Sequence, residues 1–152
     1  SDFKMVTLRL NEQKQNLTTD IVHHGLDTDA FILKHGVMKD KSTAIFNGIG
    51  RIKKGATRSN AVQESRILML SEKARGDANP MLLIDENDVT AGHAASVGQV
   101  DPMQLYYLMS RGITKENAER LVVQGFLNPV VDQLPIEEVK KQLAEVIERK
   151  VR

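Results

Sequence analysis

The sequence contains no cysteine, and this absence excludes several kinds of site. Without cysteine the chain has no disulfide framework, no thiolate nucleophile and no sulfur ligand for zinc or iron. Aromatic residues are also scarce, at 4% of the chain. A reducing compartment suits such a composition.

The sequence also lacks an excess of either charge and a long apolar run. Its 21 basic and 20 acidic residues leave a net charge of +1, so we expect neither nucleic acid nor an anionic membrane as a partner. No segment approaches the roughly 20 apolar residues of a membrane span, and the first residues form no signal peptide. We therefore expect a cytoplasmic protein. Because the chain begins at Ser1 without methionine, we also expect it to be part of a longer protein.

The periodicity of the apolar residues changes near Val100 and predicts two regions, 1–100 and 101–152. In the first region, short runs rich in β-branched residues alternate with polar corners that contain Asp, Asn, Gly or Pro. We predict strands of about five residues at most of these runs: 5–10, 19–24, 30–33, 44–52, 66–70, 81–84 and 93–97. No helix fits between most of them, so the pattern leaves a sandwich, a barrel or a β-solenoid open.

The second region has helical periodicity. Asp101 as N-cap and Pro102 at the first position predict a helix that reaches Arg111 and stops at Gly112. Thr114 begins a second helix that we expect to end near Gly125, before a break at Asn128-Pro129. A third, amphipathic helix is predicted to begin after Pro135 and to reach the C-terminus.

The four histidines are the candidates for metal binding or acid–base chemistry. His23 and His24 are adjacent, so in a strand they point to opposite faces and cannot both bind one ion. His35 is remote in the sequence, and no HExxH spacing occurs, so we expect no metal site within this chain alone. His93 lies among Ala and Gly neighbours that would leave its imidazole accessible.

The sequence resembles the C-terminal core of the SufB and SufD scaffold proteins of the Suf iron–sulfur cluster assembly system. The resemblance is carried by ordered blocks at 55–60 (GATRSN), 70–75 (LSEKAR), 88–89 (DV), 92–99 (GHAASVGQ) and 105–113 (LYYLMSRGI). It implies a mainly β fold, a right-handed parallel β-helix (a single-stranded β-solenoid) followed by a small C-terminal helical domain. It also implies a non-catalytic scaffold that pairs with a SufB-like subunit through the β-helix.

Within that family the chain is more similar to SufD than to SufB. SufB-like sequences carry cysteine where this chain has Glu64 and glutamate where it has Ala94. Many relatives carry cysteine at the position of Ala91. His93 matches a histidine that SufD-like proteins contribute at the SufB–SufD interface. The resemblance thus implies that His93 binds iron or a transient cluster only together with the partner subunit.

The resemblance further implies that the C-terminal helices bind a SufC-like ATPase. The residues expected to make this contact are Leu105, Tyr106, Met109, Leu121 and Val122. We expect the isolated chain to bind no cofactor and to form a homodimer, because an open β-helix end can pair with a copy of itself. The alternative is a β-helix enzyme acting on polysaccharide through paired carboxylates.

Overall fold

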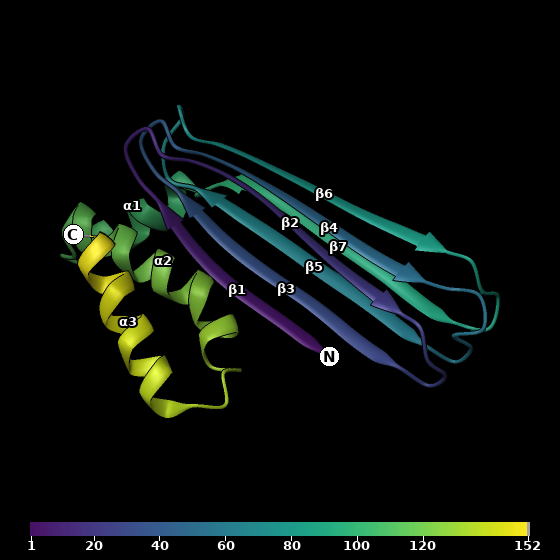
Figure 1. Cartoon of the computed structure of the whole chain (residues 1–152). Coiled ribbons are helices and arrows are strands. Elements are labelled where there is room, and N and C mark those ends of the chain that lie inside the picture. Colours follow the sequence, from purple (N-terminus) through teal and green to yellow (C-terminus); the bar gives the residue numbers. More distant parts are fainter. Residues whose placement is uncertain (152) are drawn as a thin grey trace.

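The computed structural model describes residues 1–151, which form a parallel β-solenoid followed by three helices (Figure 1). The strands are β1 (Asp2–Arg9), β2 (Lys14–His23), β3 (Asp29–Met38), β4 (Thr43–Ile52), β5 (Asn60–Met69), β6 (Arg75–Ile84) and β7 (Thr90–Gln99). The helices are α1 (Pro102–Ser110), α2 (Lys115–Val131) and α3 (Glu137–Val151). The mainly β architecture with C-terminal helices is therefore confirmed.

The chain alternates between two sheets, and each strand pairs in parallel with the strand one full turn later. The sheets have the orders β1-β3-β5-β7 and β2-β4-β6. Asp2 pairs with Phe31, 29 residues later. The next turns, from Asp29 to Asn60 and from there to Thr90, are 31 and 30 residues long. Because the turns differ in length at their corners, the sequence shows no strict repeat.

The strands are longer than predicted, and the expected length of about five residues was wrong. A strand of four residues was expected at 30–33, whereas β3 runs from Asp29 to Met38. The reason is that β3 continues through Lys34, His35 and Gly36, whose polarity and small size interrupt the apolar pattern. These residues are held in the strand by the backbone ladders to β1 and β5 on either side.

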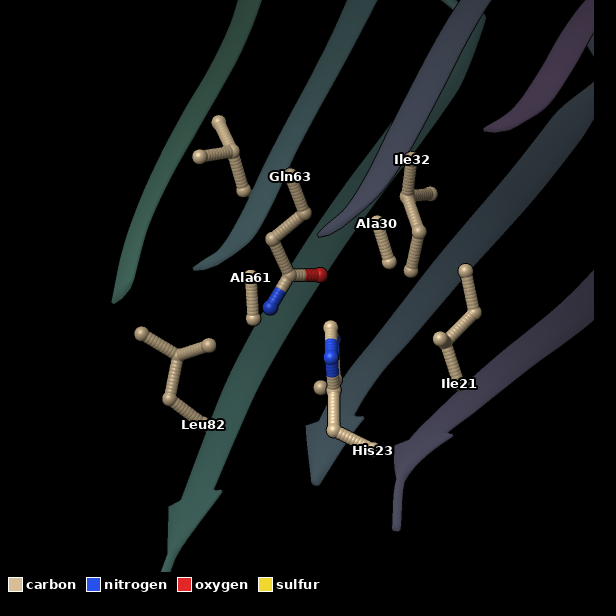
Figure 2. Close-up of a pocket in the computed structure, with 9 residues that line it drawn as sticks. Ile21, His23, Ala30, Ile32, Ala61, Gln63 and Leu82 are labelled. Atoms are coloured by element: carbon tan, nitrogen blue, oxygen red, sulfur yellow. The ribbon is translucent and has the colours of Figure 1, made fainter. Parts of the chain in front are cut away.

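The inner faces of the two sheets enclose a narrow lumen (Figure 2). A core cluster inside it is formed by Met38, Ala44, Phe46, Ile67 and Ala74. The Phe46 ring lies so close to Gly36 that a Cβ there would be 2.7 Å from its Cζ atom. Large and small side chains on the facing strands therefore interlock.

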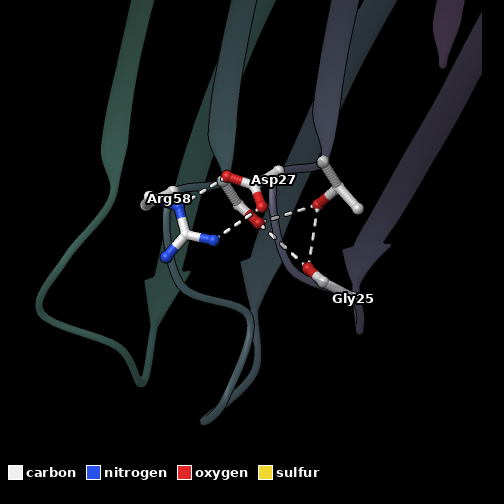
Figure 3. A network of polar contacts seen from close by, with 5 residues as sticks. Gly25, Asp27 and Arg58 are labelled. Carbon is white, nitrogen blue, oxygen red and sulfur yellow. Dashed lines mark hydrogen bonds and ion pairs between the residues drawn. The ribbon is translucent and has the colours of Figure 1, made fainter.

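Several corners between strands use residues in the left-handed conformation, and the corresponding corners of successive turns stack. Asp27 and Arg58 have φ values of 52° and 56°. The Arg58 guanidinium donates two hydrogen bonds of 2.6 Å to the Asp27 carboxylate of the preceding turn (Figure 3). The bidentate pair lowers the pKa of Asp27 and offsets some backbone strain of the two corners.

Helix α2 packs against the outer face of the first sheet and continues further than predicted. We expected it to end near Gly125, but it passes through Pro129 to Val131. Val130 and Val131 are buried, so packing outweighs the hydrogen bond that a proline cannot donate. The caps at Asp101 and Thr114 are confirmed, since their side chains accept from the backbone N–H groups of Met103 and Asn117, respectively.

The solenoid and the helices share one apolar cluster. Leu8 of β1 and Val37 of β3 pack with Val123 and Leu127 of α2 and with Ile147 of α3. All five side chains are buried. The first sheet is thus covered on both faces, by the lumen residues and by the helices, in the part of the chain that carries β1 and β3.

Candidate functional site

The last turn of the solenoid has an open edge at β7. Its ten residues, Thr90–Gln99, include no Asp, Glu, Lys or Arg, and most are exposed. Thr90 N–H donates to Ser59 O and Val100 N–H donates to Met69 O, each at 2.9 Å. Since successive N–H groups of a strand point to opposite sides, the odd-numbered residues of β7 direct theirs toward the open edge. Such an edge is a template for another strand.

His93 lies on this edge strand, at the mouth of the lumen. It pairs in register with Gln63 of β5, and paired residues of parallel strands project from the same face. Gln63 is buried and faces the lumen, so His93 projects on the lumen side one strand further out. Its side chain is exposed. The accessibility expected from its small neighbours is therefore observed, while its functional role stays a prediction.

The lumen contains a buried lysine, Lys34, whose burial was not predicted from the sequence. Lys34 has 0% of its surface exposed. Its Nζ donates to the backbone oxygen of Asn47 at 2.8 Å and lies 5.8 Å from the centre of the Phe46 ring. Burial lowers the pKa of Lys34 to about 8. The available signal was a single lysine inside a strand whose other inward residues are apolar or glycine.

His23 and Gln63 are two further polar residues of the lumen (Figure 2). The Gln63 Nε2 donates to Met81 O at 2.9 Å, while its Oε1 has no partner. His23 Nδ1 lies 2.6 Å from Thr28 Oγ1, while its Nε2 has no partner. Burial lowers the pKa of His23 and so favours the neutral ring. His23 is buried and His24 is exposed, as the alternation of a strand predicts.

His35 connects the solenoid to helix α2. Its Nδ1 donates to the backbone oxygen of Phe126 at 2.8 Å, and the two rings stack with centroids 4.9 Å apart. Its Nε2 lies 3.6 Å from Glu64 Oε1. No sequence pattern indicates that His35 lies beside a helix residue 91 positions away.

Helices α1 and α2 form a shallow apolar groove, and of the five expected contact residues only Val122 lines it. The groove has a volume of about 450 Å³ and is lined by Asp101, Met103, Gln104, Tyr107, Leu108 and Val122. Of the expected residues, Tyr106, Met109 and Leu121 are 65%, 44% and 46% exposed. Leu105 and Val122 are half-buried. The two helices thus expose several large apolar side chains to solvent.

Among residues 1–151 the structure brings together no cluster of three or more His, Cys, Asp or Glu side chains that could hold a metal ion. In the same range, none of the helices has the length and apolar character needed to cross a membrane.

Comparison with known families identifies the class of protein. The family described as "SUF system FeS cluster assembly, SufBD core domain" matches residues 1–126. The match covers the solenoid, α1 and most of α2. The chain therefore belongs to the SufBD family.

Individual relatives narrow this assignment. The chain is 70% identical over 151 residues to the iron–sulfur cluster assembly protein SufD of Bacillus subtilis, covering 99% of this chain and 35% of that protein. It is 34% identical over 126 residues to a SufBD family protein of Mycobacterium bovis, covering 83% of this chain and 15% of that protein. A Staphylococcus saprophyticus family member is 34% identical over 128 residues, or 82% and 27% of the two chains. The chain spans about a third or less of each relative.

The buried amine of Lys34 should make folding stability depend on pH. Below about 8 the amine is protonated in both the folded and the unfolded chain. Between about 8 and its ordinary value of 10.5, the unfolded chain binds a proton that the folded chain does not. We therefore expect the free energy of unfolding to rise with pH across this window.

The measurement is denaturant unfolding of the wild type and of Lys34→Met at several pH values from 7 to about 10.5. The difference between the two proteins isolates Lys34 from the other groups that titrate in this range. The same substitution at the partly exposed Lys39 is the control. Equal pH slopes for the wild type and Lys34→Met would contradict the lowered pKa.

Proposed function

We propose that this chain is the C-terminal part of a non-catalytic scaffold subunit for iron–sulfur cluster assembly. In this proposal it pairs with a SufB-like subunit through the open end of the solenoid and binds a SufC-like ATPase through α1 and α2. The main supporting observation is the uncharged, exposed strand β7 with His93 at the mouth of the lumen. Family membership and the 70% identity to a SufD protein support the same assignment.

Pairing through β7 is supported by the chemistry of its edge. Ala91, Ala95 and Gly98 give the strand a small profile that allows close backbone approach. Natural edge strands that avoid pairing usually carry lysine, proline or a bulge. β7 contains neither lysine nor proline. A SufB-like subunit can add a strand here, and so can a second copy of this chain related by two-fold symmetry.

A site for iron at this junction needs ligands from the partner. His93 supplies one imidazole, which suits iron. Cluster ligation normally relies on thiolates, and this chain has no cysteine, with Ala91 in place of one that many relatives carry. A thiolate from the SufB-like subunit would complete the donor set. The cluster is then a transient cargo rather than a resident cofactor.

Binding of a SufC-like ATPase is supported by exposed apolar side chains of α1. Tyr106 and Met109 are large, exposed and adjacent on successive turns of one helix face. Aromatic side chains of this kind are typical anchors of protein interfaces. Movements of the ATPase could reach the solenoid because α2 shares its apolar core.

The alternative of a polysaccharide-active enzyme has less support. A glycosidase needs two carboxyl groups that are free to act as acid, base or nucleophile. Several strand carboxylates instead lie within ion-pair distance of arginine: Asp20 with Arg51, Glu64 with Arg66 and Asp77 with Arg75.

His93→Ala tests the proposed cluster site. We expect the free energy of unfolding to change by less than about 0.5 kcal/mol, because the side chain is exposed. Cluster assembly by the complete complex should fall, measured by the visible absorption of the reconstituted cluster. His24→Ala, at an exposed corner, is the control. Unchanged assembly with normal binding of both partners would show that His93 has no part in cluster chemistry.

Ala95→Pro tests pairing through β7. The N–H of residue 95 points to the open edge, so proline removes a donor to an added strand without removing one to β5. We expect the wild-type chain to scatter light as a dimer and Ala95→Pro as a monomer of 17.0 kDa. Capture of the SufB-like subunit should weaken in parallel. Ala95→Ser keeps the donor and should behave as wild type, and a monomeric wild type would contradict the proposal for self-pairing.

Combined substitution of Tyr106 and Met109 by alanine tests the helical contact. We expect the Kd for the SufC-like ATPase to rise at least about tenfold, measured by calorimetry, since exposed anchors typically contribute about 1–2 kcal/mol each. Val139→Ala, at an apolar position of α3 about as exposed as Met109, is the control. Deleting the helices is a poorer test, because Val123 and Leu127 belong to the shared core. An unchanged Kd would exclude this face of α1 from the contact.

A further inference from the structure

Two of the buried polar atoms that lack a hydrogen-bond partner belong to residues that line the same cavity in the lumen. They are His23 Nε2 and Gln63 Oε1. Both residues line one cavity, and Figure 2 shows the imidazole and the amide directed into it from opposite sheets. A buried polar atom without a partner typically costs about 1–3 kcal/mol. Two such atoms around one cavity therefore favour a small polar ligand between them.

The cavity has the size of one water molecule. The volume that the centre of a water can occupy is about 10 Å³, close to the minimum that holds a single ordered water. The remaining lining is Ile21, Ala30, Ile32, Gly50, Ala61, Val62 and Leu82. This space is too small for an organic ligand. A cation would need several oxygen ligands, whereas the side-chain groups facing the cavity offer one such atom.

We propose that the solenoid lumen contains a specific internal water site that bridges His23 Nε2 and Gln63 Oε1. The amide oxygen only accepts hydrogen bonds, so the water donates one proton to it. The water then either donates its second proton to His23 Nε2 or accepts a hydrogen bond from Nε2 through its oxygen. The site is formed by β2 of one sheet and β5 of the other, so the water links the two sheets across the lumen.

The surrounding hydrogen bonds fit such a water with either histidine tautomer. Thr28 Oγ1 lies 2.6 Å from His23 Nδ1 and 2.7 Å from Ser59 Oγ, so it can donate to the ring or accept from it. In the first case Nε2 carries the proton and donates to the water, and in the second it accepts from the water. A direct contact between His23 and Gln63 would satisfy only the first tautomer. The lowered pKa of His23 agrees with a neutral ring.

Gly48 keeps the amide in place for this water. A Cβ at position 48 would clash with Gln63 Oε1 and would lie 3.4 Å from Lys34 Nζ. A larger residue at position 48 would therefore displace the amide oxygen. Gln63 and His93 are paired residues of neighbouring strands. The water therefore also holds the amide side chain next to that histidine.

The direct test is a high-resolution crystal structure of this chain. We expect an isolated density peak within about 2.7–3.2 Å of both His23 Nε2 and Gln63 Oε1. An empty cavity, or the two atoms in direct hydrogen-bond contact, would overturn the proposal. This experiment uses the wild-type chain and does not depend on the folding of any variant.

Oxygen-17 relaxation dispersion in solution counts long-lived internal waters and supplies the second arm. Gln63→Met removes the acceptor at nearly constant volume, and we expect it to contain one long-lived water fewer than the wild type. Gln133→Met is the matched control, because Gln133 Nε2 also donates to a backbone oxygen but its side chain is on the surface. Equal counts in the wild type and Gln63→Met would refute the site.

Discussion

The parallel backbone ladder between successive turns is the interaction on which the rest of this structure depends. It fixes the register of each strand on the strand one turn earlier, and the register decides which side chains enter the lumen. Gln63 lies beneath His93 for this reason, and Lys34 enters the lumen because its strand is paired on both sides. A shift of one residue in β5 would expose Gln63 and bury Glu64. The polar interior and the mouth of the lumen are therefore consequences of strand pairing rather than of local preference.

The sequence predicted the order of strands and helices but not the length of the strands. Apolar runs marked the strands, and N-caps such as Asp101 and Thr114 marked the helix starts correctly. The predicted strand ends were wrong where polar residues enter the lumen, as at Lys34, because a polar residue interrupts the apolar periodicity and so predicts the end of a strand. The pattern could not choose between a sandwich and a solenoid, since the turns differ in length, from 29 to 32 residues. The family resemblance supplied that choice.

The candidate site was predictable only in part. His93 was found through its small neighbours and its match to a family motif, and its exposure agrees with that interpretation. His23 and Gln63 were not predicted to face one another, because 40 residues of sequence separate them and only the stacking of turns brings them together. His35 was missed for a related reason, since its partner Phe126 belongs to a helix whose continuation past Gly125 was not expected. Long-range packing, which periodicity does not report, decides all of these positions.

Pro80 makes the two open edges of the last turn unequal. Arg75 and Asp85 donate their N–H groups to β4, so the even-numbered residues of β6 face the open edge. Pro80 is one of them, and its ring nitrogen has no proton to offer an added strand. The ladder of the second sheet thus cannot be extended without a gap, whereas β7 offers an unbroken row of donors. The two edge strands of the last turn therefore differ as surfaces for strand addition, and only β7 offers every donor that an added strand needs.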